Sequence, residues 1–129
     1  MSRKAIYSML TTDARLHAIG MTSATTYGSA TMQSPSEQLF TVLKYGDDTA
    51  FLGMLSTQSL EVWVYDMPGS YSRINNVIDI VKQILTVENV DVVDEDGGRF
   101  SQARWMSTSR ELYDDIYKRV TRFATFNVV

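Results

Sequence analysis

The residues that could carry catalysis are few, and none of them stands in a recognisable catalytic pattern. His17 is the only histidine, and no serine motif that a histidine base could activate accompanies it. We therefore expect a structural or surface role for His17. Cysteine is absent, which excludes disulfides, thiolate zinc sites, iron–sulfur clusters and cysteine nucleophiles within these 129 residues. The sequence predicts no enzyme and no cofactor.

Three consecutive carboxylates, Asp94, Glu95 and Asp96, precede two glycines. A calcium loop of the EF-hand type places its oxygen ligands at alternate positions instead, so this spacing does not predict a metal site. Neither glycine pattern that cradles phosphates, GxGxxG or GxxxxGK[ST], occurs in the chain. We interpret residues 94–98 as the solvated tip of a hairpin.

Basic residues gather in the last third of the chain, where aromatic residues alternate with them. They are Arg99, Arg104, Arg110, Lys118, Arg119 and Arg122. On adjacent strands they could form a strip that binds single-stranded nucleic acid through phosphate contacts and base stacking. Three acidic residues interrupt this strip, and the whole chain has a net charge of −3. We therefore favour charge pairing across strands or between subunits.

An apolar segment beyond the turn signal Gly46-Asp47-Asp48 permits two interpretations. Phe51, Leu52, Met54 and Leu55 are flanked by glycine and polar residues. They either pack in the core or form the tip of a projecting arm that is buried against a neighbouring molecule, since exposed apolar patches usually mark association sites. The sequence leaves both interpretations open.

The clearest structural signal is a strand, a turn and a helix between Ser59 and Leu85. Residues 60–65 alternate, with Leu60, Val62 and Val64 on one face of the expected strand. Residues 67–70, Met-Pro-Gly-Ser, suit a tight turn. Apolar residues then recur at spacings of three and four, which predicts an amphipathic helix. Its apolar stripe consists of Ile74, Val77, Ile78, Val81, Ile84 and Leu85.

The other elements follow from shorter patterns. Residues 3–19 predict a helix with a break at 11–13, where Asp13 caps a second short helix that Gly20 ends. Residues 21–38 predict an irregular connection with a short strand around 25–28. Further strands are expected over residues 39–45, 87–93, 99–109 and 117–129, and residues 111–115 are expected to form a turn.

Length and element order set the fold class. A chain of 129 residues fits one domain, residues 1–129, that can bury a sizeable core. The apolar runs are much shorter than the roughly 20 residues of a membrane-spanning helix, and the N-terminal segment lacks the features of a secretory signal. The order helix, strands, helix, strands predicts an α+β fold, with a mainly antiparallel sheet and its helices packed on one face.

Several short segments suggest a family. The broken helix is followed by Thr26-Tyr27-Gly28-Ser29-Ala30 and by a strand at residues 40–43. The segment VWVYDMPGSYSRIN, residues 62–75, and the alternating strand at residues 122–129 complete the pattern. In this order, these segments resemble the tail-terminator (tail-completion) proteins of long-tailed bacteriophages. The likeness extends over nearly the whole chain. It depends on the order of the elements and on a few short sequence segments.

The resemblance implies a structural virion protein that assembles into a homohexameric ring at the head-proximal end of the tail tube. Such a ring ends tube polymerisation, joins head-closure or connector proteins and leaves a channel for viral DNA. The implied location is the neck of the virion, after assembly in the host cytoplasm. Alternatives are another neck component, such as a head-closure protein, or a small nucleic-acid-binding module or enzyme. The candidate assembly interface comprises Asp47, Asp48, Phe51, Leu52, Met54, Leu55, Asp94, Glu95, Asp96, Arg104, Arg119 and Arg122.

Overall fold

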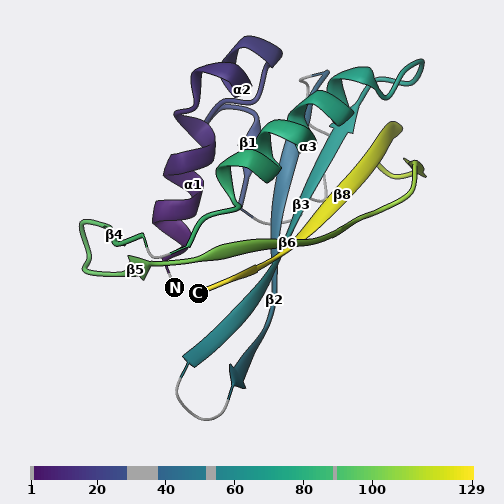
Figure 1. The fold of residues 1–129 in the computed structure, drawn as a ribbon. Coiled ribbons are helices and arrows are strands. Elements are labelled where there is room, and N and C mark those ends of the chain that lie inside the picture. Colours follow the sequence, from purple (N-terminus) through teal and green to yellow (C-terminus); the bar gives the residue numbers. More distant parts are fainter. Residues whose placement is uncertain (1, 29–37, 52–54, 89) are drawn as a thin grey trace.

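The computed structural model describes residues 2–28, 38–51, 55–88 and 90–129. It shows an α+β fold, as predicted, in which three helices lie on one side of a mostly antiparallel sheet (Figure 1). The elements are α1 (Arg3–Thr11), α2 (Ala14–Ile19), β1 (Thr26–Tyr27), β2 (Phe40–Phe51), β3 (Leu55–Asp66), α3 (Ser72–Ile84), β4 (Val92–Val93), β5 (Arg99–Phe100), β6 (Ala103–Thr108), β7 (Leu112–Asp114) and β8 (Arg119–Val128).

Among the described residues, the main sheet has six strands, and the long ones are β2, β3 and β8. Its order is β1-β2-β3-β8-β6, and β7 also pairs with β8. The short strand β1 runs parallel to β2, and the other pairs are antiparallel. The strands β4 and β5 form a separate two-stranded hairpin, which contacts α1. This hairpin confirms the predicted tip at residues 94–98.

The predicted strand, turn and helix are confirmed. The side chains of Leu60, Val62 and Val64 have no exposed surface and face the helices. Gly69 has a φ of +133°, a value that few other residues adopt, so glycine suits this position in the turn. The predicted stripe on α3 packs onto the sheet, since Ile74, Val77, Ile78 and Val81 are buried. The burial of apolar surface along this helix supplies most of its stability.

The broken N-terminal helix is also confirmed. The carboxylate of Asp13 accepts hydrogen bonds from the backbone N–H groups of Arg15 and Leu16, so it caps α2. The pKa of Asp13 is lowered, first by its hydrogen bond with the Arg15 side chain. Gly20 ends α2 with a φ of +122°. None of the described helices is long and apolar enough to cross a membrane.

The opposite face of the sheet carries a second buried cluster that is largely aromatic. Phe40 stacks on Tyr65 with ring centroids 4.6 Å apart, and Tyr117 meets both rings edge-on. Trp63 stacks on Phe123 at 4.2 Å. Such pairs add stability beyond the area they bury, so they help to hold β2, β3 and β8 together. Sequence alternation placed Trp63 and Tyr65 on this face, but not their partners.

Four sequence predictions need correction. The segment Gly46-Asp47-Asp48 is not a turn, because β2 continues through it to Phe51. Of the described residues between 87 and 93, which leave out residue 89, Val92 and Val93 form the strand β4 and Val87 forms a single bridge. Residues 99–109 divide into β5 and β6, and residues 111–115 contain the strand β7 instead of a turn. For residues 46–48 and 111–115, pairing with another strand decided the local structure, and local propensity cannot show this.

Candidate assembly surfaces

The hairpin of β2 and β3 extends beyond the rest of the sheet. Gln58 pairs with Val128, the last residue of β8, and the pairs beyond it join only β2 and β3. These outermost pairs are Thr49–Thr57, Ala50–Ser56 and Phe51–Leu55. Figure 1 shows this two-stranded ribbon projecting away from the helices. We call residues 49–51 and 55–57 the arm. Of the predicted apolar tip, Phe51 and Leu55 close its described part, and Leu52 and Met54 lie outside the described residues.

A β-bulge lies at the base of the arm. Gly46 and Asp47 on β2 stand opposite Ser59 alone on β3, because the register shifts between Tyr45 and Asp48. An added Cβ at Gly46 would lie 2.1 Å from Oγ of Ser59, so glycine allows the close approach. A bulge bends its strand and increases the local twist. The bulge therefore sets the direction in which the arm leaves the sheet.

The acidic tip between β4 and β5 is ordered by one of its own carboxylates. Oδ1 of Asp94 accepts hydrogen bonds from the backbone N–H groups of Asp96 and Gly98, both at 2.8 Å. The hydroxyl of Ser2 donates to the other oxygen of Asp94 and joins the tip to the start of α1. These hydrogen bonds lower the pKa of Asp94, and the bond from Ser2 has the largest effect. The sequence indicated the tip but not its attachment to Ser2.

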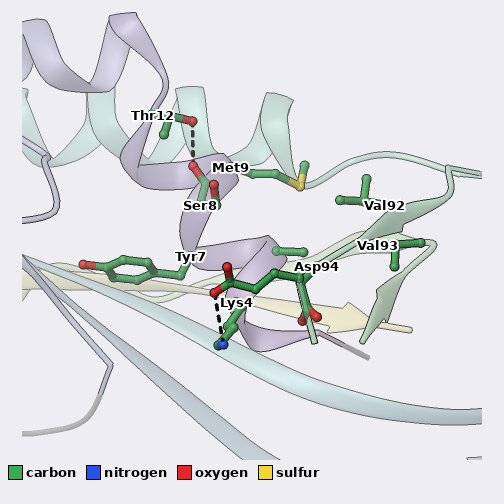
Figure 2. A pocket seen from close by; sticks show the side chains of 10 residues that line it. Lys4, Tyr7, Ser8, Met9, Thr12, Val92, Val93 and Asp94 are labelled. Atoms are coloured by element: carbon green, nitrogen blue, oxygen red, sulfur yellow. Dashed lines mark hydrogen bonds and ion pairs between the residues drawn. The ribbon is translucent and has the colours of Figure 1, made fainter. Parts of the chain in front are cut away.

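Beside this tip lies a pocket of about 500 Å³ between α1 and β4 (Figure 2). Ala5, Met9, Val92 and Val93 supply apolar walls. Lys4 forms ion pairs with Asp96 and, at 3.5 Å, with Glu95, and the Asp96 pair raises the pKa of Lys4. The two lining carboxylates, Asp94 and Glu95, outnumber the single lining cation, so the rim of this pocket carries one net negative charge.

The predicted basic strip is not continuous, because its members lie on different surfaces. Arg104 is exposed and pairs with Asn127 on the face of the sheet away from the helices. Arg122 points the other way: its Nε and Nη2 donate to the carbonyl of Ser109 at 3.0 and 2.8 Å. Its Nη1 donates to Oδ1 of Asn75 on α3 at 2.6 Å. Arg122 thus joins three segments of its own chain.

Arg119, at the start of β8, is half-buried. Its Nη1 donates to the backbone carbonyl of Tyr117 at 3.0 Å, within the turn that links β7 to β8. The structure therefore separates Arg104, which presents its charge to solvent, from Arg119 and Arg122, which form bonds within the chain.

A groove between α3 and β6 was not predicted. A hollow of about 400 Å³ is lined by Asn75, Ile78, Asp79, Lys82, Trp105, Thr108 and Arg122. The ammonium of Lys82 lies 4.0 Å from the ring centroid of Trp105, which remains 39% exposed. A second hollow of about 520 Å³ shares Asp79 and Lys82, so the depression continues along α3. No local pattern in β6 indicated this groove, because the exposure of Trp105 depends on how α3 packs beside the strand.

The lone histidine, His17, contacts the end of the preceding helix. Nε2 of His17 contacts the backbone carbonyl of Thr11, so the ring joins α2 to the end of α1, as the expected structural role requires. Within the described residues, no three His, Asp or Glu side chains are grouped so that they could hold a metal ion.

No protein-family model matches the chain, and no curated protein matches it in sequence. Among solved structures, it is similar to a chain of the virion of a native gene transfer agent (GTA) particle. The match has a TM-score of 0.67 and covers 97% of this chain and 90% of the other. The two sequences are 16% identical, so the likeness is one of fold. The fold therefore occurs, over nearly its full length, in a chain of a virion particle.

Proposed function

We propose that this chain is a structural, non-enzymatic protein of a phage-like virion. One observation carries the proposal: its fold matches a chain of the GTA virion over nearly the whole length of both chains. The sequence resemblance to tail terminators was found independently of that match and points to the same class of protein. The candidate surfaces also fit, since they offer an arm and grooves for contacts with other proteins.

Within the virion, we assign the chain to the head-proximal end of the tail tube. There it forms a homohexameric ring that ends tube polymerisation, contacts the tube protein on one side and joins the head-closure proteins on the other. A closed ring needs heterologous contacts, in which one patch meets a different patch on the next copy. The arm and the grooves are distinct patches of this chain, and such contacts can use them. The net charge of −3 suits a channel that DNA crosses without binding, because affinity for DNA comes mostly from cations that neutralise phosphates.

Deletion of the gene tests this role. Particles made without the chain should have abnormally long tails or tails that fail to join filled heads, and the wild-type gene supplied in trans should restore both. Tails of normal length that join heads normally would contradict the role. Electron microscopy of tagged virions separates the terminator from its alternative, because a tag on the head side of the neck would identify a head-closure protein.

A further inference from the structure

The turn that follows β7 presents the most exposed large apolar side chain of the described residues. Ile116 is 77% exposed, and Tyr113, three residues earlier, is 52% exposed. The turn itself is ordered, because Oδ1 of Asp114 accepts a hydrogen bond from the backbone N–H of Tyr117 at 2.7 Å. The ring of Tyr117 is buried in the aromatic cluster. Two exposed apolar side chains held on an ordered segment form a candidate contact patch.

This patch is also acidic. Residues 111–117 contain three carboxylates and no cation, and Lys118 follows them. Asp115, which precedes Ile116, is exposed and forms no ion pair with the described residues. We call residues 113–116 the acidic turn. A surface that receives the acidic turn should combine apolar walls with a cation that lacks a carboxylate partner.

A hollow with these properties lies between the start of α1 and β2. Its volume is about 230 Å³, and its lining residues are Arg3, Lys4, Tyr7, Gly28, Leu43 and Tyr45. Lys4 is paired with the acidic tip, but Arg3 is exposed and forms no ion pair with the described residues. An apolar cavity of about 150 Å³ can hold benzene, so this hollow has room for the side chain of Ile116.

The three hollows described above suit the acidic turn less well. The pocket between α1 and β4 has a negative rim, which opposes an acidic partner. In the groove between α3 and β6, Arg122 is engaged by Ser109 and Asn75, which leaves Lys82 against the carboxylate of Asp79. The hollow that continues along α3 contains only the same two charges, Asp79 and Lys82.

The places of the two patches in the sheet also favour the hollow beside Arg3. The acidic turn follows β7, which pairs with β8 toward one edge of the main sheet, and the hollow borders β2 near the other edge. The groove between α3 and β6 lies on the same side as the acidic turn, because β6 also pairs with β8. Patches on opposite sides allow one copy to contact two neighbours at once, as a ring requires.

We propose that the acidic turn of one copy enters the hollow beside Arg3 on the next copy. The proposal rests on the proposed ring and names the two patches that meet in it. Ile116 packs against Tyr7 and Tyr45, and Asp115 pairs with Arg3. The turn is ordered before it docks, so the contact loses little conformational entropy. Because the turn and the hollow are different patches, the contact is heterologous and can close into a ring.

Engineered cysteines test the contact directly, since the chain has no cysteine of its own. In the variant Arg3→Cys with Asp115→Cys, each copy carries one thiol at the hollow and one at the turn. Mild oxidation should give a ladder of covalent oligomers on a non-reducing gel. A mixture of the two single variants should stop at dimers, because each heterologous contact uses one thiol of each kind. The matched control, Asp115→Cys with Asp79→Cys in the groove between α3 and β6, should give no ladder.

Truncation of Ile116 tests the apolar part of the contact. Because Ile116 is 77% exposed in the free chain, Ile116→Ala should leave urea unfolding of the monomer unchanged. In sedimentation, it should weaken self-association by about tenfold or more. Met106→Ala, at another exposed apolar position, should leave association within about threefold of wild type.

Charge reversal tests the ion pair. The variant Arg3→Glu should weaken self-association by about tenfold at low salt, and adding Asp115→Arg should restore most of it. Arg104→Glu, at an exposed position on the face of the sheet away from the helices, should leave association within about threefold of wild type. Circular dichroism spectra that match wild type would show that each variant folds.

The outcomes separate this inference from the ring itself. A ladder from the Arg3–Asp115 cysteine pair, together with restoration by the reversed charges, supports the inference. If wild type associates but Ile116→Ala and Arg3→Glu have no effect, the ring stands and this contact is wrong. Weakening by Arg3→Glu that Asp115→Arg does not restore would show that the hollow receives another occupant, which also contradicts the inference. A wild-type chain that stays monomeric up to about 1 mM contradicts the ring and the contact together.

Discussion

Two nitrogen atoms of Arg73, Nε and Nη2, donate hydrogen bonds to the two carboxylate oxygens of Asp66. The Nε–Oδ2 distance is 2.9 Å, and Asp66 is only 4% exposed. Asp66 ends β3 and Arg73 lies in the first turn of α3, so the pair joins the two elements across the turn between them. Bidentate geometry of this kind adds direction as well as energy. The pair therefore helps to set the angle between the central helix and the sheet.

Replacement of Arg73 should destabilise the protein. The variant Arg73→Ala leaves the buried carboxylate of Asp66 without its cation, and we expect a loss of about 1–3 kcal/mol in the free energy of unfolding, since Arg73 itself is partly exposed. Urea denaturation measures this loss. The variant Arg110→Ala, at an exposed position after β6, should change stability by less than about 0.5 kcal/mol. Equal effects of the two variants would contradict the structural role of the pair.

The buried stripe of α3 gives a test of packing. Ile78→Ala and Val81→Ala should each cost about 1–4 kcal/mol, because both residues are buried between helix and sheet. Gln83→Ala, on the exposed face of the same helix, is the matched control. Losses below about 0.5 kcal/mol at the two buried positions would show that this face is not core in the free chain.

Arg104 and Arg122 should respond differently to truncation, although both belong to the predicted basic strip. Arg122→Ala removes three hydrogen bonds within the chain and should lower the free energy of unfolding by about 1–2 kcal/mol. Arg104→Ala removes an exposed charge and should leave stability within about 0.5 kcal/mol. The free energies of unfolding of the two variants, measured by thermal or urea denaturation, test this difference. Equal losses at Arg104 and Arg122 would contradict it.

The variant Arg104→Ala also tests the alternative that the chain is a nucleic-acid-binding module. If the outer face of the sheet bound single-stranded DNA, Arg104→Ala would weaken a salt-dependent interaction that wild-type protein shows at low salt. We expect no such interaction in a fluorescence-anisotropy titration. Binding that is lost with Arg104 would favour a nucleic-acid-binding module over a tail component.

The acidic tip should contribute stability that depends on pH. Its Asp94 has a pKa below the ordinary value of 3.8, so its contribution is present above that value and is lost as pH falls through the lowered pKa. The variant Asp94→Ala should therefore melt at a lower temperature than wild type at neutral pH, and the difference should shrink as pH falls below 3.8 and through the lowered pKa of Asp94. Asp91→Ala removes only a surface pair with Arg99 and serves as the control. A difference that stays constant with pH would show that the charge of Asp94 is not involved.

The parts of the fold that could be predicted are those with a local signal. The spacing of Ile74, Val77 and Val81 gave the amphipathic helix, and Asp13 and Gly20 gave the limits of α2. The parts that could not be predicted depend on the partner strand. Residues 46–48 have the composition of a turn, but pairing with β3 carries the strand through them as a bulge.

The candidate surfaces, too, depend on parts of the chain that are distant in sequence. The sheet register shows that β2 and β3 continue past the last residue of β8, and the local sequence does not show this because it depends on the length of β8. Alternation along the last strand does not show which face the helices cover, so it could not place Arg104 and Arg122 on opposite sides. The groove beside Trp105 needs α3 and β6 to lie together, and no local pattern in either segment indicates that contact.

Electron microscopy of the purified wild-type protein tests the central claim most directly. The account predicts ring-shaped particles with an open central channel, and six-fold symmetry in their averaged images. Wild-type images that contain only single small particles, at concentrations where sedimentation also finds a monomer, would contradict the claim that this chain acts by assembling into a ring.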